Sequence, residues 1–467
     1  MGEDKRKNVL LLVADQFRYD CQGFINEVPV LTPNLDRLAE DAFSFENAYT
    51  AIPTCCPSRQ SFYAGRRCES FHAYWNYNLP MAIGGLPLSA YSFLRDFTAA
   101  DYQSVHVGVP ELSPEYGPEE YGYLRGRNVR QEYELLTNLQ VTADRPRTYD
   151  GWIEDGELCH TLTGYTASCA MEELERMRQA SERPFFLTVC FTSPHPPYNP
   201  HRQFYQLYRH AEKWGSFEEC FENKPYIQRQ QLYNWGYQDR TWADWEPVVR
   251  KYYAAVTEVD FHIGRILDWL KQEGLYDDTL IVFTADHGDL CGAHRMFDKH
   301  YVLYEDVTHV PLLIKTCGRR YQGRSREYTV HNLDLAPTLM ELCGIATSAE
   351  RLDGYSLVPV LQGGKSKRRE AVSTENGAQF GLYIQRCIKT DAWKYIWNPT
   401  DVDELYCLRE DPYELVNRIG DQSCRTVLRE LKSRLLEILI REGDGFCDNG
   451  KAMVVKQQLC AENKVGR

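Results

Sequence analysis

The stretch KNVLLLVADQ, residues 7–16, decides the fold of this chain. Six apolar residues follow one another without interruption, and the run then ends on Asp15 and Gln16. A continuous apolar run of this kind is typical of a strand that is buried on both faces of a parallel sheet. The stretches FFLTVCF (185–191) and TLIVFTA (279–285) have the same character. We therefore expect three strands of one sheet.

Helical patterns lie between these strands. Thr32 and Pro33 suit the cap and the first position of a helix, and further helices are expected around residues 166–179 and 249–273. Strands that alternate with helices predict a doubly wound α/β fold with a large mixed or parallel sheet. Ligands of such folds bind at the carboxyl ends of the strands. The polar residues that follow the three strands are therefore expected to meet at one edge of the sheet.

Composition narrows the class of protein. The chain has 467 residues, of which 43% are hydrophobic and 25% charged, enough to bury a sizeable core. Its formal net charge of -13 argues against a nucleic-acid partner, whose phosphates need a basic face. The sequence contains neither a secretory signal pattern nor an apolar run of about 20 residues that would span a membrane. A cytoplasmic protein without a membrane partner is expected.

Two domains are expected, a catalytic α/β domain over residues 1–364 and a small C-terminal α+β subdomain over residues 365–467. Three short strand patterns and one amphipathic helix support the second domain. They cover residues 381–387, 393–397 and 404–408 for the strands and residues 426–440 for the helix. Two segments rich in aromatic residues, 111–160 and 199–248, have the character of insertions. They would either shape a substrate pocket or form a satellite core under long loops.

Two short motifs point to the chemistry. CCPSR, residues 55–59, follows the first strand and helix, and DHG, residues 286–288, follows the third strand. GAH, residues 292–294, and Lys299 come shortly after the second motif. In this order these residues resemble the sulfatase branch of the alkaline phosphatase superfamily. The resemblance spans nearly the whole chain.

The resemblance implies the nucleophile. In sulfatases the first residue of C-x-P-S-R is oxidised to formylglycine by a maturation enzyme, so Cys55 is the expected precursor. One hydroxyl of the hydrated aldehyde would attack sulfur, and the other would later expel sulfate. Arg59 would hold the hydrate oxygen and balance its charge as a fixed cation. The alternative is a buried pair of cysteines before a proline turn.

Metal ligands are expected at the ends of the first and third strands. Asp15, Asp286 and His287 are the candidates, with Gln16 as a neutral oxygen donor and Cys55, as formylglycine, in the same shell. Such ligands suit a hard divalent cation, for which we expect calcium, with magnesium or manganese as alternatives. The competing interpretation is that each acid only caps the helix after its strand. Gln16 stands where many sulfatases have a second Asp, as it does in choline sulfatases and phosphonate monoester hydrolases.

Two further side chains are expected to contact the ester. His195 lies in SPHPPY, residues 193–198, which resembles the histidine-proline loop of the family. An imidazole titrates near working pH, which suits a general acid. Lys299 would bind the ester as a point charge. The alternatives are a loop histidine bonded to backbone and a solvated surface lysine.

One segment departs from the family pattern. Typical sulfatases carry Gly-Lys-x-His between the nucleophile and the histidine-proline loop, whereas this chain has GVPE, residues 108–111. Val109 and Glu111 therefore stand where the family has lysine and histidine, and two cationic contacts are missing unless His72 or His106 supplies one. Phosphonate and phosphodiester hydrolases of the superfamily lack the same pair.

We therefore expect metal-assisted hydrolysis of a sulfate monoester on a sugar or aryl group. The alternatives are a phosphonate monoester or phosphodiester hydrolase of the same superfamily, and a non-catalytic binder of sulfated glycans. The expected partners are a small-molecule or glycan sulfate ester and the enzyme that generates formylglycine. A homo-oligomer is also expected.

Overall fold

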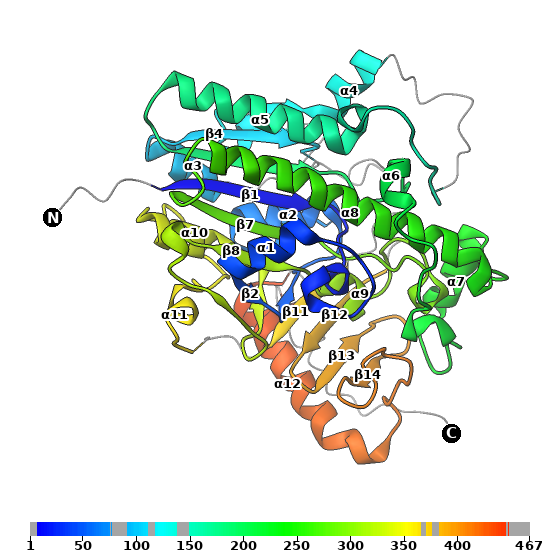
Figure 1. Ribbon diagram of the computed structural model, residues 1–467. Helices are drawn as coiled ribbons and strands as arrows, with labels where there is room; N and C mark the ends of the chain where they lie inside the picture. Colours follow the sequence, from blue (N-terminus) through cyan, green and yellow to red (C-terminus); the bar gives the residue numbers. More distant parts are fainter. Residues whose placement is uncertain are drawn as a thin grey trace.

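A computed structural model describes residues 7–74, 76, 91–110, 117–137, 149–365, 370–375, 383–444 and 447. Its centre is an eight-stranded sheet with the order β5-β4-β6-β1-β7-β8-β2-β9 (Figure 1). β1 (Asn8–Ala14) runs parallel to both β6 (Phe185–Phe191) and β7 (Thr279–Ala285). The three strands predicted from their apolar runs are thus neighbours at the centre of the sheet.

The sheet is mixed towards one edge. β4 (Gln103–Gly108) and β5 (Arg125–Asn128) extend it in parallel beyond β6. On the other side, β8 (Leu312–Lys315) is antiparallel to β7, β2 (Phe43–Phe45) is antiparallel to β8, and β9 (Gly323–Ser325) is parallel to β2. The parallel centre brings the carboxyl ends of β1, β6 and β7 to the same edge, where ligands of such folds bind.

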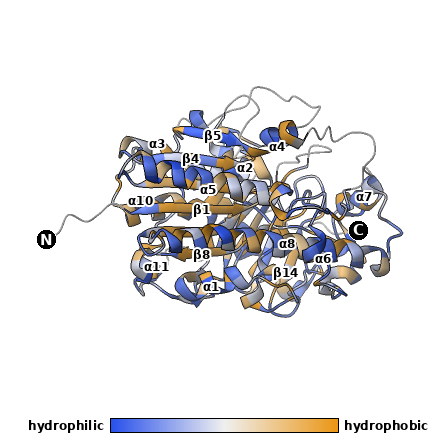
Figure 2. Cartoon of the chain, turned by 45° about the horizontal axis from the view of Figure 1, so that its top comes forward, coloured by the Kyte–Doolittle hydropathy of each residue, from blue (hydrophilic) through white to orange (hydrophobic). Residues whose placement is uncertain are grey.

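Helices cover both faces of this sheet. One layer consists of α1 (Pro33–Asp41), α5 (Leu162–Ala180) and α8 (Trp242–Gln272), and the other of α2 (Cys55–Ala64), α3 (Phe93–Ala99) and α10 (Leu335–Cys343). Figure 2 shows apolar strands lying between helices that turn hydrophilic residues outward. This arrangement confirms the predicted α/β fold and buries the apolar stripe of each helix.

The start of α1 differs from the expectation. The hydroxyl of Thr32 makes no capping bond and donates instead to Asp36 at 2.8 Å. The free N–H groups of Asn34 and Leu35 donate to the carboxylate of Asp260 on α8, at 3.1 and 2.7 Å. The cap therefore comes from a helix far along the chain, which no local pattern could indicate.

A second sheet, antiparallel and four-stranded, forms the C-terminal region. Its order is β11 (Ala371–Glu375), β12 (Gln385–Lys389), β13 (Trp393–Trp397) and β14 (Glu404–Cys407). α12 (Arg425–Glu442) packs on it, with Leu435 and Leu439 in one core with Ile388 and Leu405. The small α+β unit agrees with the prediction, but β11 was not expected. The boundary between residues 364 and 365 stays a prediction.

The two aromatic segments differ from each other. The described part of 111–160 adds β5 to the sheet and α4 (Val129–Thr137) beyond it. The segment 199–248 contains α6 (Arg202–Tyr205) and α7 (Tyr226–Trp235), and α8 begins inside it at Trp242 rather than near residue 249. Trp214 and Trp245 lie buried in the main core. Among the described residues, no helix is both long and apolar enough to cross a membrane.

Candidate active site

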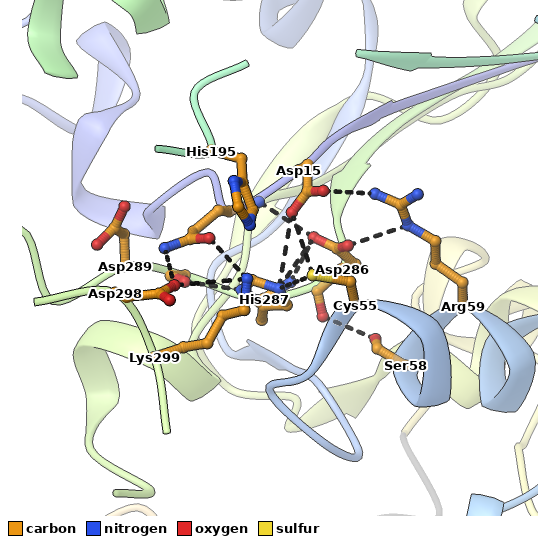
Figure 3. Close-up of polar contacts among 12 residues, drawn as sticks. Asp15, Cys55, Ser58, Arg59, His195, Asp286, His287, Asp289, Asp298 and Lys299 are labelled. Carbon is orange, nitrogen blue, oxygen red and sulfur yellow. Dashed lines mark hydrogen bonds and ion pairs between the residues drawn. The ribbon is translucent and has the colours of Figure 1, made fainter. Parts of the chain in front are cut away.

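The candidate site lies where β1 and β7 end. Ala14 and Ala285 are paired in register, so the residues that follow them, Asp15 and Asp286, lie side by side (Figure 3). Both carboxylates are buried. Gln16 takes a left-handed conformation with φ 67° and donates its backbone N–H to Asp286 Oδ1 at 3.1 Å. The sharp turn after β1 thus fixes the acid at the end of β7.

α2 presents Cys55 to these carboxylates. The helix begins at Cys55 itself. The residue expected as nucleophile precursor therefore lies in the first turn, where the helix dipole favours negative charge. Its Sγ is 3.2 Å from His287 Nε2 and 3.8 Å from Asp15 Oδ1.

Hydrogen bonds of Ser58 hold α2 against the end of β7. Ser58 Oγ donates to the carbonyl oxygen of Asp286 at 2.8 Å and accepts a hydrogen bond from Asn332 Nδ2 at 3.2 Å. Asn332 also donates to Thr50 Oγ1 at 3.1 Å and accepts from the backbone of Ala51 at 3.2 Å. The serine of the motif is therefore a structural link between the helix and the strand that carry the site.

Four buried side chains form a cluster with the dimensions of a metal site. The ligand atoms of Asp15, Cys55, Asp286 and His287 all lie within 4.8 Å of one another. His287 Nδ1 donates to the carbonyl oxygen of Gly288 at 2.8 Å, so Nε2 carries the lone pair that can bind a metal. Burial lowers the pKa of His287 to about 4, which keeps the ring neutral. Two carboxylates and one neutral imidazole fit a divalent cation.

Arg59 bridges the two carboxylates. Its Nη2 donates to Asp15 Oδ2 at 2.9 Å and its Nε to Asp286 Oδ2 at 3.0 Å. Nη1 donates to the carbonyl oxygen of Val109 at 3.1 Å. Burial alone would raise the pKa of Asp286, but attraction to His287 and Arg59 holds it below its usual range. Arg59 thus helps to keep Asp286 ionised and fixes the oxygen of each acid that points away from Cys55.

Lys299 reaches the cluster through Gln16. Lys299 Nζ donates to Gln16 Oε1 at 2.9 Å, and Gln16 Nε2 donates to Asp298 Oδ1 at 2.8 Å. Burial alone would lower the pKa of Lys299, but attraction to Asp298, Cys55 and Asp15 raises it well above its ordinary value. Lys299 is therefore a buried cation beside the cysteine. The amide oxygen of Gln16, expected as a metal donor, is shared with this ammonium group.

His195 lies over the same cluster, on the loop after β6 (Figure 3). Its side chain is half-buried, and Nδ1 donates to the carbonyl oxygen of Pro196 at 2.6 Å. Burial would raise the pKa of Asp298, but attraction to Lys299, His300 and His195 holds it below its usual range. The structure therefore gathers all the predicted site residues, from four separate parts of the chain, in one place.

Comparison with known proteins agrees with this geometry. Residues 7–345 match the model of the sulfatase family, and residues 292–441 match the C-terminal model of N-sulphoglucosamine sulphohydrolase. The chain belongs to the sulfatase family. The predicted membership in this group of sulfuric ester hydrolases is confirmed.

Relatives of this sulfatase cover nearly its whole length. It is 27% identical to an arylsulfatase of Clostridium perfringens, over 96% of this chain and 97% of the relative, and 29% identical to a choline-sulfatase of Rhizobium meliloti, over 92% and 86%. In fold it is similar to the phosphonate monoester hydrolase of Agrobacterium radiobacter, with a TM-score of 0.76, 23% identity and coverage of 94% and 96%. A structure solved with D-glucosamine-2-N,6-O-disulfate also has a TM-score of 0.76, at 20% identity and coverage of 96% and 99%.

The departure from the sulfatase pattern has a structural counterpart. Val109 contributes only its backbone, whose carbonyl oxygen accepts from Arg59, and Glu111 lies outside the described residues. His106 is buried in β4 against Tyr123, where burial lowers its pKa to about 3, so it supplies no cation. His72 is exposed and pairs with Tyr74. His106 therefore does not replace the missing lysine.

Sequence reasoning missed two members of the site. Asp298 holds both Gln16 and Lys299, and its position directly before the predicted lysine was a usable signal. Asn332 acts on Ser58 from 274 residues away. Since that contact depends on how α10 follows the short turn at Asn332, no spacing in the sequence indicates it.

Proposed function

We propose that this chain is a formylglycine-dependent sulfatase that hydrolyses sulfate monoesters of ring-bearing alcohols. The observation that carries the proposal is the buried cluster of Asp15, Cys55, Asp286 and His287 at the first turn of α2. Cys55 is the precursor of the formylglycine, which a maturation enzyme would generate and which supplies the nucleophilic hydroxyl.

Asp15, Asp286 and His287 would hold a divalent cation. The amide oxygen of Gln16, which accepts from Lys299, would be a further ligand. Calcium suits this set because most of the donors are oxygen atoms. The ion would supply positive charge beside the sulfate oxygens. Arg59 holds the two carboxylates in place, whatever ion is bound, through its bonds of 2.9 and 3.0 Å.

Lys299 and His195 are assigned to the ester itself. Lys299 is a buried cation beside Cys55, and such a charge stabilises the sulfate oxygens as the ester bond breaks. His195 lies over the cluster with Nδ1 fixed by Pro196, so Nε2 is the atom that would pass a proton to the leaving oxygen.

A phosphonate monoester or phosphodiester hydrolase is the second candidate. Val109 favours it, because the lysine that sulfatases carry at this place is absent and only the backbone carbonyl faces Arg59. The phosphonate and phosphodiester hydrolases that the sequence resembles also lack this lysine, and their substrates carry the same single negative charge as a sulfate monoester.

The test is a pair of rates measured on one preparation. Mass spectrometry first determines how much of Cys55 is converted to the aldehyde. The rates on an aryl sulfate and on an aryl phosphonate monoester are then compared. We expect the sulfate to be preferred. A preference for the phosphonate would establish the second candidate, and binding of sulfated glycans without turnover of either ester would indicate a non-catalytic binder.

A further inference from the structure

We propose that Tyr149 and Trp235 form an aromatic ledge beside the active site that stacks on the sugar ring carrying the sulfate. The preferred substrate would then be a sulfated saccharide and not an alkyl or simple aryl sulfate. The inference rests on the proposed sulfatase function and narrows its substrate class. It concerns side chains from the two aromatic segments, which no catalytic role above has used.

The ledge consists of two rings in contact. The centroids of Tyr149 and Trp235 are 5.0 Å apart, with the ring planes at 85°. Tyr149 is 50% exposed, and Trp235 is partly exposed. Both rings pack on Phe297, at 6.3 and 5.4 Å. Tyr149 is therefore packed against Trp235 and Phe297 while half of its surface faces solvent. This is the arrangement of a binding surface and not of a core.

Contacts on two sides place the ledge next to the loops that carry Lys299 and His195. Phe297 directly precedes Asp298 and Lys299 in the chain. On the other side, a Cβ atom on Gly151 would lie 2.0 Å from the carbonyl oxygen of Tyr198, so the backbone after Tyr149 runs against the loop that carries His195. The ledge therefore lies between the loop of Lys299 and the loop of His195, the two groups assigned to the ester.

Polar groups adjoin the aromatic rings. Asp150, the residue after Tyr149, forms an ion pair with Arg240 at 2.6 Å and accepts from the hydroxyl of Tyr237 at 3.1 Å. The two charged side chains remain 20% and 23% exposed. A sugar presents apolar C–H faces for stacking and hydroxyl groups for hydrogen bonds, so aromatic rings beside a carboxylate and a guanidinium match it. An alkyl or simple aryl group has no hydroxyls for Asp150 and Arg240.

The experiment compares Tyr149→Ala with wild type on three kinds of sulfate ester. The probes are the best of a panel of monosulfated hexosamine isomers, 4-nitrophenyl sulfate and ethyl sulfate. We expect wild type to prefer the sugar sulfate. Tyr149→Ala should lower kcat/KM for the sugar sulfate about tenfold, mainly through KM, and leave ethyl sulfate unchanged. Tyr149→Phe keeps the ring and should retain the preference.

Tyr233→Ala is the matched control, because Tyr233 is an exposed tyrosine of the same aromatic segment, at 58%, on α7. It should leave all three rates unchanged. An equal loss on every ester would mean that Tyr149 only supports the loop of Lys299. A loss on the aryl sulfate alone would mean that the ledge binds aryl groups. Either result, or no loss at all, would overturn the proposal. A wild type that cleaves ethyl or aryl sulfate but no sugar sulfate would overturn the ledge and leave the sulfatase function standing, whereas turnover of phosphonates only would overturn both.

Discussion

At the scale of the residue, the site depends on two carboxylates whose two oxygens each have different partners. Asp15 and Asp286 each direct Oδ2 to Arg59, at 2.9 and 3.0 Å. Their Oδ1 atoms lie 3.7 and 3.8 Å from His287 Nε2, on the side of Cys55. One oxygen of each acid is thus held by a cation of the protein, and the other faces His287 and Cys55, where a metal ion would bind. Arginine suits this role because its planar guanidinium binds two acceptors at fixed angles.

Asp286→Asn tests this division. The amide has one oxygen only, so it cannot both accept from Arg59 and face the cluster, and its NH₂ group would meet another donor. We expect the variant to lose its bound divalent metal and at least about a hundredfold in activity. Elemental analysis of the purified protein measures the first effect. Metal retained at the wild-type level would remove Asp286 from the ligand set.

Lys299→Ala tests the buried ammonium group. Removing a cation that contacts the ester in a dry site should lower kcat/KM by about 100- to 1,000-fold, corresponding to about 3–4 kcal/mol of transition-state stabilisation. Steady-state rates on an aryl sulfate give the value. The control is Lys213→Ala, since that lysine is exposed and pairs with Glu218 at the surface. A rate like that of wild type would take Lys299 out of the site.

At the scale of the element, the loop after β7 packs very closely against the backbone of residues 306 and 307. A Cβ atom on Gly288 would lie 2.0 Å from the carbonyl oxygen of Asp306. The backbone of Gly288 donates to Val307 at 2.9 Å, and that of Asp289 to Asp306 at 3.0 Å. The glycine after the Asp-His pair is therefore required by the approach of α9 (Glu305–Thr308) behind it. This contact fixes the direction of His287.

Gly288→Ala should separate these two segments. The added methyl group must displace backbone, so we expect a loss of about 1–3 kcal/mol of unfolding free energy together with most of the activity. Denaturant unfolding and rates on one preparation measure both. Gly420→Ala is the control, because no atom lies within 4 Å of its Cβ position. Equal behaviour of the two variants would show that the loop adapts without strain.

The elements that could be predicted were those with a local signal. The apolar runs predicted β1, β6 and β7, and the rule that strand ends meet brought Asp15 together with Asp286. The start of α2 at Cys55 could not be predicted, because Thr54 makes no side-chain cap and the helix is held instead by Ser58 and Asn332. Contacts between distant segments override local preference in such places.

At the scale of the whole molecule, a chain of buried charges ties the parts together. Arg18 pairs with Asp306 at 2.7 Å, and His294 lies between Asp306 and Glu219, at 3.4 and 2.8 Å. Lys224 completes the chain. It pairs with Glu219 and donates to the carbonyl oxygen of Glu414, which lies beside the C-terminal sheet. The network joins the loop after β1, the aromatic segment and the C-terminal region. Breaking one member leaves an uncompensated charge in the interior.

The pH dependence of stability should reveal this network. Burial would raise the pKa of Glu219, but His294 and Lys224 lower it to about 2 from 4.5, so its stabilising effect is present above pH 4.5 and is lost as the pH falls towards 2. Burial would lower the pKa of His294, but Asp306 and Glu219 raise it above 6.5, so its effect is present below pH 6.5 and is lost as the pH rises through the folded value. Both contributions are complete between those two limits.

His294→Gln should therefore cost about 3–5 kcal/mol of unfolding free energy at pH 5.5 and less at pH 8.5. Urea unfolding of wild type and variant at the two pH values gives the difference. Glu175→Gln, which breaks the exposed pair with Arg178, should cost little at either pH. A His294→Gln penalty that stays constant across this range would mean that the histidine is held by packing and not by charge, and the three segments would then be joined by their apolar contacts alone.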